Sequence, residues 1–220
     1  MNYIPARYLI ILAALFAGCG SGEPAVGPHD IPTDSVYYQR PAAANTPEGM
    51  EWARKRYARV QEMAAAGRLT CDTLRYDCPA DAVVGWFAYC YADDGALITG
   101  SHAESTGDHY TVTERYYYDG DELFFAHLTT TGWSFGGPEG RDAAGNPVPG
   151  TIDDVKEERK YYSDGNLIDR LYKEYTLTSG PDSPDPDDVP NSTQGTPIDD
   201  GLGSEAVRAI AGDKAYACPE

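Results

Sequence analysis

The sequence predicts an α+β fold, an antiparallel β-meander of about six strands with one amphipathic helix packed on the sheet. Two observations predict it. A tyrosine-rich pattern with a central Asp-Gly pair occurs three times between residues 91 and 168, and one long segment of helical periodicity precedes it. Asp-Gly between apolar runs is the strongest local signal for a β-hairpin. Residues 46–220 are expected to form a single α+β domain, since about 150 residues of patterned sequence support one core.

The chain begins with a pattern that is typical of an export signal. Arg7 precedes an apolar run from Tyr8 to Phe16, and two small residues and Cys19 follow. A basic start, a short apolar core and a small-residue cleavage site are the three parts of a secretory signal peptide, here residues 1–18. The apolar run is shorter than the roughly 20 residues that a membrane-spanning helix needs.

Ala17-Gly18-Cys19 resembles the lipobox of bacterial lipoproteins. The resemblance implies cleavage before Cys19, diacylglycerol on its sulfur and acylation of the new amine, for example with palmitate. It therefore implies a protein of the bacterial cell envelope that is held on a membrane through lipid on Cys19. Gly20, by analogy with sorting in enteric bacteria, favours the outer membrane. The alternative is an ordinary secretory signal with a chance cysteine.

Two elements are expected between the signal and the repeats. Residues 19–45 are rich in Gly, Pro, Ala and polar residues, which predicts a flexible tether. A helix is expected to follow, with Thr46 as its cap, Pro47 in its first turn and Gly67 at its end.

The expected helix has one apolar face and a cationic side. The apolar positions recur at helical spacing, and they are Met50, Ala53, Tyr57, Val60 and Ala64. Arg54, Lys55 and Arg59 lie mostly off this face. They are expected to face solvent while the helix packs on the sheet, and a cationic binding surface is the alternative.

The three repeats place the strands. These are expected near residues 83–92, 96–104, 109–118, 122–131, 154–163 and 167–178. The second repeat has one additional residue, Glu122, which predicts a longer turn or a bulge. The pattern resembles Tyr-rich Asp-Gly hairpin repeats of uncharacterised exported bacterial proteins and, more distantly, MORN-like repeats, and no functional residue is carried over from either.

The remaining segments lack strand periodicity. Residues 136–150 are expected to form a loop, and residues 179–203, rich in Pro, Asp, Ser and Gly, a disordered acidic loop. A short helix is expected over residues 204–211.

Four cysteines remain after Cys19, namely Cys71, Cys78, Cys90 and Cys218. An even number in an exported chain predicts two disulfides. Three pairings are possible, of which Cys71–Cys78 with Cys90–Cys218 is favoured. Zinc is the rival, but no C-x-x-C pair occurs, so no metal is expected here.

The charge of the chain limits its partners. The net charge is −18, and it becomes −19 when residues 1–18, with Arg7, are removed. Such a surface repels nucleic acid and anionic lipid headgroups and attracts cations or cationic proteins. Solubility alone is the simpler explanation of the charge.

No motif predicts a catalytic residue or a cofactor. Gly132-Trp133-Ser134-Phe135-Gly136 matches the nucleophile elbow G-x-S-x-G, but a Gly/Pro loop follows it where that motif needs a helix. A possible metal cluster consists of His102, Glu104, Asp108 and His109. A possible Ca²⁺ cluster consists of Asp182, Asp185, Asp187 and Asp188, although prolines interrupt it. Both clusters are expected to be solvated turns and loops.

The functional expectation is a non-enzymatic, lipid-anchored envelope protein. Its 17 tyrosines suggest a Tyr-rich sheet that binds a protein or a glycan, with simple packing as the alternative. A second hypothesis is an acidic inhibitor of a cationic protein, such as a lysozyme-like wall hydrolase. A third is an enzyme that uses carboxylates, or a metal at His102 and His109.

Overall fold

The computed structural model describes residues 47–79, 81–107, 109–141, 143–179, 183–199 and 201–218. The signal peptide, Cys19, the tether and the expected cap Thr46 lie outside the described residues, as do Asp108 and Asp182 of the two candidate clusters.

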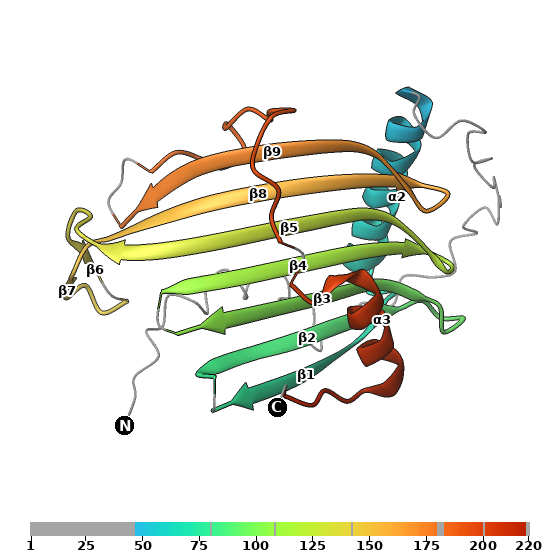
Figure 1. Ribbon diagram of the computed structural model, residues 1–220, viewed down its shortest axis with the longest axis horizontal. Coiled ribbons are helices and arrows are strands. Elements are labelled where there is room, and N and C mark those ends of the chain that lie inside the picture. The colour runs from blue at the N-terminus through green and yellow to red at the C-terminus, as the bar shows by residue number, and fades with distance from the viewer. Residues whose placement is uncertain are drawn as a thin grey trace, which may run out of the picture.

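Seven strands form one antiparallel sheet in the order β1-β2-β3-β4-β5-β8-β9, so each strand pairs with its neighbour in this sheet along the chain (Figure 1). The strands are β1 (Thr70–Cys78), β2 (Val83–Tyr91), β3 (Leu97–Thr106), β4 (Tyr110–Asp119), β5 (Glu122–Phe135), β8 (Thr151–Ser163) and β9 (Asn166–Thr178). A two-stranded ribbon of β6 (Gly140–Arg141) and β7 (Pro147–Val148) lies between β5 and β8. The α+β class and the meander are confirmed.

The three Asp-Gly repeats form three hairpins, as predicted. Gly95, Gly120 and Gly165 all have positive φ, and Asp164 has φ +51° beside Gly165 at φ +74°, which is the pattern of a type I′ turn. The pairing register shifts just before the turn in each hairpin, at Tyr91, Tyr118 and Tyr162. The bulge expected from Glu122 is therefore present, but it is common to all three repeats.

The prediction of about six strands is too low. Strand β1 was not expected, because among its nine residues only Leu74 and Tyr76 carry the alternating apolar signal and most of the others are exposed. As an edge strand it has one neighbour, so it needs little apolar surface. The loop expected at residues 136–150 contains the short β6–β7 ribbon.

Helix α2 (Pro47–Ala65) lies across one end of one sheet face, and Gly67 follows it with φ +66°. Trp52, Ala53 and Val60 are its buried positions, and they pack against Tyr117, Phe124 and Phe125. Ala64, expected on the apolar face, is exposed, because the buried face is centred on Trp52 rather than on Tyr57. The Arg56 guanidinium pairs with Asp119 in the β4–β5 turn.

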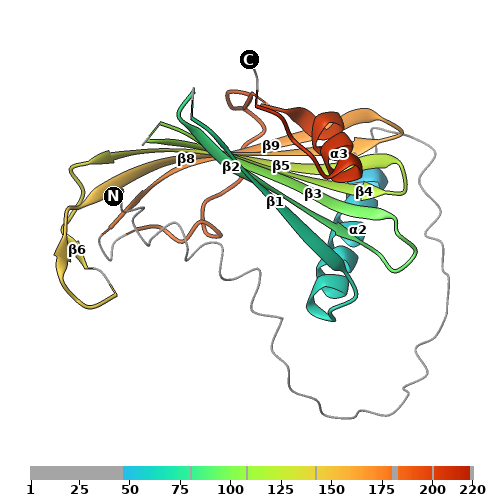
Figure 2. The ribbon, with the colours of Figure 1, turned by 90° about the horizontal axis from the view of Figure 1, so that it is seen from below.

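Helix α3 (Gly203–Asp213) covers the opposite face, and Figure 2 shows the two helices on either side of the sheet. Val207 and Ala211 are buried against β2 and β3. The approach depends on Gly100, since a Cβ there would lie 2.9 Å from Val207 Cγ1. Arg208 pairs with Asp121, so both helices hold the β4–β5 turn.

Residues 183–199 lie in the acidic segment for which the sequence predicts disorder. Ser192 and Tyr172 exchange both backbone hydrogen bonds at the free edge of β9, each 2.8 Å long. The segment then crosses the sheet, where Ile198 is buried in the same cluster as α3 (Figure 1). It therefore caps an open strand edge and covers part of the α3 side.

The two disulfides are confirmed, but the favoured pairing is wrong. The structure pairs Cys71 with Cys90 and Cys78 with Cys218. Cys71 lies directly opposite Cys90 in the β1–β2 register, a relationship that exists only because residues 70–78 form a strand. The second bridge fastens the chain after α3 to the end of β1.

Candidate functional site

The two faces of the sheet differ in how much protein covers them. Side chains alternate between the faces along each strand. One face carries α3 and the segment that contains Ile198, and it is called the α3 face below. On the other, the α2 face, helix α2 covers the end of the sheet that holds the β4–β5 and β8–β9 turns (Figure 2). Residues 183–191 cover part of the same face beside β9, where Lys173 Nζ donates to the Pro186 carbonyl at 2.7 Å. Between these two covers the face is open beside α2.

A pocket of about 270 Å³ lies at this boundary between α2 and the sheet. Three elements line it with alternate residues of one face, namely Arg54 and Tyr57 from α2, Phe125 and His127 from β5, and Arg159 and Tyr161 from β8. This set is called the basic-aromatic pocket below. Its volume is slightly below the ~300–1,000 Å³ of typical small-molecule sites, so it suits a small ligand or one residue of a larger one.

Aromatic rings form the wall of the pocket. The Phe125 ring lies between Tyr57, with ring centroids 5.3 Å apart, and Tyr161, at 5.0 Å. Phe125 and Tyr161 are 7% and 8% exposed, whereas Tyr57 is 37% exposed. The wall is thus a rigid apolar surface with one accessible ring at its rim.

Glu157 holds the polar side of the pocket in place. His127 Nε2 lies 3.1 Å and an Arg159 nitrogen 3.2 Å from Glu157 Oε2, and the Tyr175 hydroxyl donates to Oε1 at 2.7 Å. The hydrogen bond from His127 lowers the pKa of Glu157 to about 2, although burial acts in the opposite direction. Burial, followed by the neighbouring carboxylate, raises the pKa of Tyr175. Glu157 therefore stays ionised and orients both basic side chains.

The basic side chains here are poorly neutralised. Arg159 shares Glu157 with His127 and reaches Asn191 Oδ1 at 3.4 Å. Arg54 has no carboxylate partner among the described residues, and the same is true of Arg115, which lies opposite His127 on β4. In a chain of net charge −18, this concave spot thus has a local surplus of positive charge, which electrostatically favours an anion over a cation.

The α3 face instead contains a closed network of polar groups. Glu114 is fully buried, and its carboxylate lies 2.8 Å from His102 Nδ1 and 2.9 Å from the Tyr116 hydroxyl. His102 Nε2 lies 2.7 Å from the Tyr76 hydroxyl, which donates to Glu104 at 3.0 Å. Burial, followed by Glu104, raises the pKa of Tyr76. The polar groups of this network are satisfied from within the protein.

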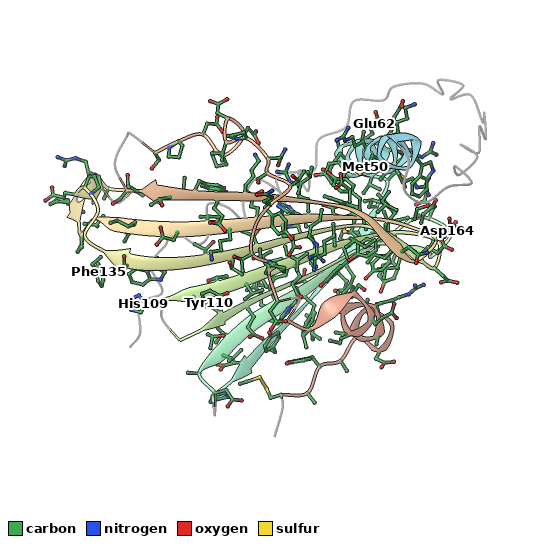
Figure 3. The ribbon with its side chains drawn as sticks, turned by 45° about the horizontal axis from the view of Figure 1, so that its top comes forward. Met50, Glu62, His109, Tyr110, Phe135 and Asp164 are labelled. Atoms are coloured by element: carbon green, nitrogen blue, oxygen red, sulfur yellow. A yellow bond between two sulfur atoms is a disulfide. The ribbon has the colours of Figure 1, made fainter. Side chains whose placement is uncertain are left out.

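The structure separates the residues of the candidate metal cluster. His102 and Glu104 belong to the buried network, with His102 Nε2 3.8 Å from Glu104 Oε2. His109 instead lies at the end of the sheet away from α2, beside Tyr110 and Phe135 (Figure 3). Its ring is 4.1 Å from that of Trp133. Among the described side chains, no group of three or more His, Cys, Asp and Glu is arranged to hold a metal ion.

The other sequence motifs do not form sites either. Ser134 lies within β5, exposed, without the strand-turn-helix geometry of a nucleophile elbow. Asp185, Asp187 and Asp188 are exposed, and Asp185 accepts hydrogen bonds from the backbone of its own turn.

Most of the described tyrosines pack within the fold. Six are buried, namely Tyr89, Tyr116, Tyr117, Tyr118, Tyr161 and Tyr172, and four more are partly buried against the core, namely Tyr76, Tyr91, Tyr162 and Tyr216. Among the described tyrosines, only Tyr57 and Tyr110 are exposed. Side chains alternate between the two faces of the sheet, and most of these tyrosines pack against a helix or the segment that contains Ile198, so they contribute to the core. Of the tyrosines, Tyr57 and Tyr161 also line the pocket.

Four of the six pocket residues were not predicted as site residues from the sequence, namely Phe125, His127, Arg159 and Tyr161. Arg54 was singled out as part of a cationic helix side, and Tyr57 was expected to be core. A usable signal existed, since Phe125/His127 and Arg159/Tyr161 are aromatic-basic pairs two residues apart on strands. The pairing of β5 with β8 was needed to bring them together.

Comparison with protein-family models, with curated proteins and with solved structures finds no match. Within the part of the chain that the structure describes, no helix has the length and apolar character needed to cross a bilayer.

Proposed function

We propose that this chain is a non-enzymatic, lipid-anchored protein of the bacterial cell envelope, held on the outer membrane through Cys19, and that it binds a protein or glycan partner on the α2 face of its sheet. The observation that carries the binding role is the basic-aromatic pocket, in which Arg54, His127 and Arg159 surround a wall of aromatic rings in a strongly acidic chain. The basic-apolar-small pattern that ends at Cys19 supports the anchor.

The anchor and the pocket have complementary roles in this proposal. Two or more acyl chains hold a protein stably on a membrane, at about 0.8 kcal/mol per buried CH₂. A tether of ~25 residues spans about 25–30 Å r.m.s., which keeps the folded part clear of the bilayer. Binding at such a distance from the membrane suits a partner in the surrounding envelope.

Two measurements test the proposal. Mass spectrometry of the mature N-terminus should find an acylated Cys19, and Cys19→Ala should move the protein from the membrane to the soluble fraction. Crosslinking in the native envelope should capture a partner that is lost when Tyr57 and Arg54 are both replaced by Gln, but retained when Arg59, an exposed arginine of the same helix outside the pocket, is replaced instead. An unacylated N-terminus contradicts the anchor, and equal capture by all variants contradicts the binding surface.

A second candidate function is inhibition of a cationic protein. Asp185, Asp187 and Asp188 form an exposed acidic segment at the β9 edge, which adds local charge to the net −18. Electrostatic steering then predicts an association rate that falls steeply with salt. Lysozyme activity that is unchanged by excess protein at low ionic strength would falsify this candidate.

A further inference from the structure

We propose that the ligand of the basic-aromatic pocket is a small ring compound that carries one carboxylate, of the class of acidic monosaccharides. This inference rests on the proposed binding function, because it names the chemistry of the same site. It is drawn from three properties of the pocket: the one positive charge that its arginines leave unneutralised, its aromatic wall and the carboxylate of Glu157.

The arginines define the charge of the ligand. Arg54 and Arg159 line the pocket, and the only ion pair of either with a described carboxylate is that of Arg159 with Glu157. These three groups leave one positive charge, which one carboxylate on a ligand neutralises. Guanidinium groups bind carboxylates in a planar, two-point geometry, and such charge-assisted hydrogen bonds are about twice as strong as neutral ones.

A carboxylate fits better than a phosphate because of Glu157. Its oxygen lies 3.1 Å from His127 and 3.2 Å from Arg159, so the basic side of the pocket already faces one negative charge. A phosphate monoester, with nearly two negative charges, would add repulsion against this carboxylate. The ionised state of Glu157 is secured by the same hydrogen bonds.

The wall defines the body of the ligand. The Tyr57 ring, 37% exposed, can cover the C–H face of a sugar, and the buried rings of Phe125 and Tyr161 support it from behind. Around them His127 and Arg159 remain 22% and 27% exposed, so donors are present beside the apolar surface. A ring with one apolar face and hydroxyl groups at its edges can use both the apolar surface and these donors, whereas a flat aromatic acid offers the donors only its carboxylate.

The size of the pocket limits the affinity for a single sugar. A volume of about 270 Å³ accepts one monosaccharide. At ~0.3 kcal/mol per non-hydrogen atom, a ligand of about 13 such atoms binds with a dissociation constant of about 1 mM. Tighter binding of a longer glycan then requires further contacts on the open α2 face.

The test is titration of the mature full-length protein, in detergent micelles, with D-glucuronate followed by NMR or calorimetry. Saturable binding near 1 mM is expected, with D-glucose at least tenfold weaker because it has the same ring but no carboxylate. Arg54→Gln should weaken glucuronate binding about tenfold or more without changing thermal stability, since Arg54 makes no ion pair with a described residue. Arg59→Gln is the matched control and should bind as the wild type does.

Four outcomes overturn the inference. Equal binding of glucuronate and glucose would show that the pocket does not recognise a charge. Stronger binding of inorganic phosphate would show that it does not prefer a carboxylate, and stronger binding of benzoate would show that it does not prefer a sugar ring. Unchanged glucuronate binding in both Arg54→Gln and Arg159→Gln would show that the ligand does not bind in this pocket. The proposed function fails separately: an envelope partner captured without glucuronate binding leaves that function intact, whereas glucuronate binding without any captured partner leaves only the site.

Discussion

The α3 face and the α2 face of this sheet differ in how completely their arginines are paired with carboxylates. On the α3 face Glu114 and Glu158 are fully buried, and each has partners within the protein: His102 and Tyr116 for the first, Arg170 and the Ile198 backbone for the second. On the α2 face Arg54 and Arg115 remain accessible without a described carboxylate partner.

The difference follows from how the faces are covered. A charge that is taken out of water must be paired and hydrogen-bonded, or the fold loses several kcal/mol. The chain satisfies this condition where α3 and the crossing segment close the face. On the α2 face Glu157 is paired in the same way, but Arg54 and Arg115 have no carboxylate partner among the described residues, so water solvates them, and a ligand can replace that water. The arginines of the two faces thus differ: Arg170 is paired with a buried carboxylate, whereas Arg54 and Arg115 are available for recognition.

The largest expected effect is the loss of stability when a disulfide is removed, and it should differ between the two disulfides, one of which lies on each face. Replacing Cys78 and Cys218 together by Ser should lower the free energy of unfolding by about 5 kcal/mol in the chain-entropy model, because that bridge spans 140 residues and fastens the cover of the α3 face. Replacing Cys71 and Cys90, which span 19 residues, should lower it by about 3 kcal/mol. Urea unfolding under oxidising conditions measures both.

Peptide mapping is the control for this comparison. It should recover Cys71 joined to Cys90 and Cys78 joined to Cys218 from the native protein. A larger loss from the shorter bridge would contradict the view that the long bridge closes the α3 face.

The next largest effect is expected within the α3 face. Glu114→Ala removes the carboxylate that His102 Nδ1 and the Tyr116 hydroxyl contact, and both are then buried without that partner. A loss of about 3–5 kcal/mol in the free energy of unfolding is expected. Glu205→Ala on the exposed side of α3 is the control, with a change within about 0.5 kcal/mol. Similar losses in the two variants would show that the buried network carries no special weight.

The sequence predicted the parts of the fold that are coded locally. Each Asp-Gly turn lies where expected, and the six strands around them agree with prediction to within a few residues. Strand β1 was missed because only Leu74 and Tyr76 carry its pattern. The wrong disulfide pairing is a consequence of that omission, since Cys71 and Cys90 become neighbours only when β1 pairs with β2.

The pocket was beyond prediction for a different reason. Its residues come from one helix and two strands that are up to about a hundred positions apart, and no local motif joins them. The pairing of β5 with β8 across the β6–β7 ribbon decides that His127 meets Arg159. The predicted meander places these two strands side by side, but hairpin signals fix the register only within a repeat, so the register between β5 and β8 was left open.

A smaller effect, dependent on pH, is expected on the α2 face at Glu157. Its pKa of about 2 lies below the ordinary value of 4.5, so the ionised side chain stabilises the folded state above pH 4.5, and this contribution is lost as the pH falls towards 2. Allowing for solvent screening, it is worth about 2 kcal/mol. Glu157→Gln should therefore reduce stability by that amount at neutral pH and flatten the acid limb of the stability profile. Parallel acid limbs in the two proteins would contradict the assignment.

The smallest expected effect comes from replacing one arginine on each face, which compares the two faces directly through the free energy of unfolding. Arg115→Gln on the α2 face should change the free energy of unfolding by less than about 0.5 kcal/mol, because Arg115 has no described ion pair. Arg170→Gln should lower it by about 1–2 kcal/mol, because Arg170 Nε lies 2.9 Å from the buried Glu158, although not in hydrogen-bond geometry. The Ile198 backbone still donates to Glu158 at 2.8 Å, which keeps the loss below that of Glu114→Ala. Chemical unfolding of both variants decides the point, and a larger loss at Arg115 would mean that the open face depends on its cations for stability rather than for binding.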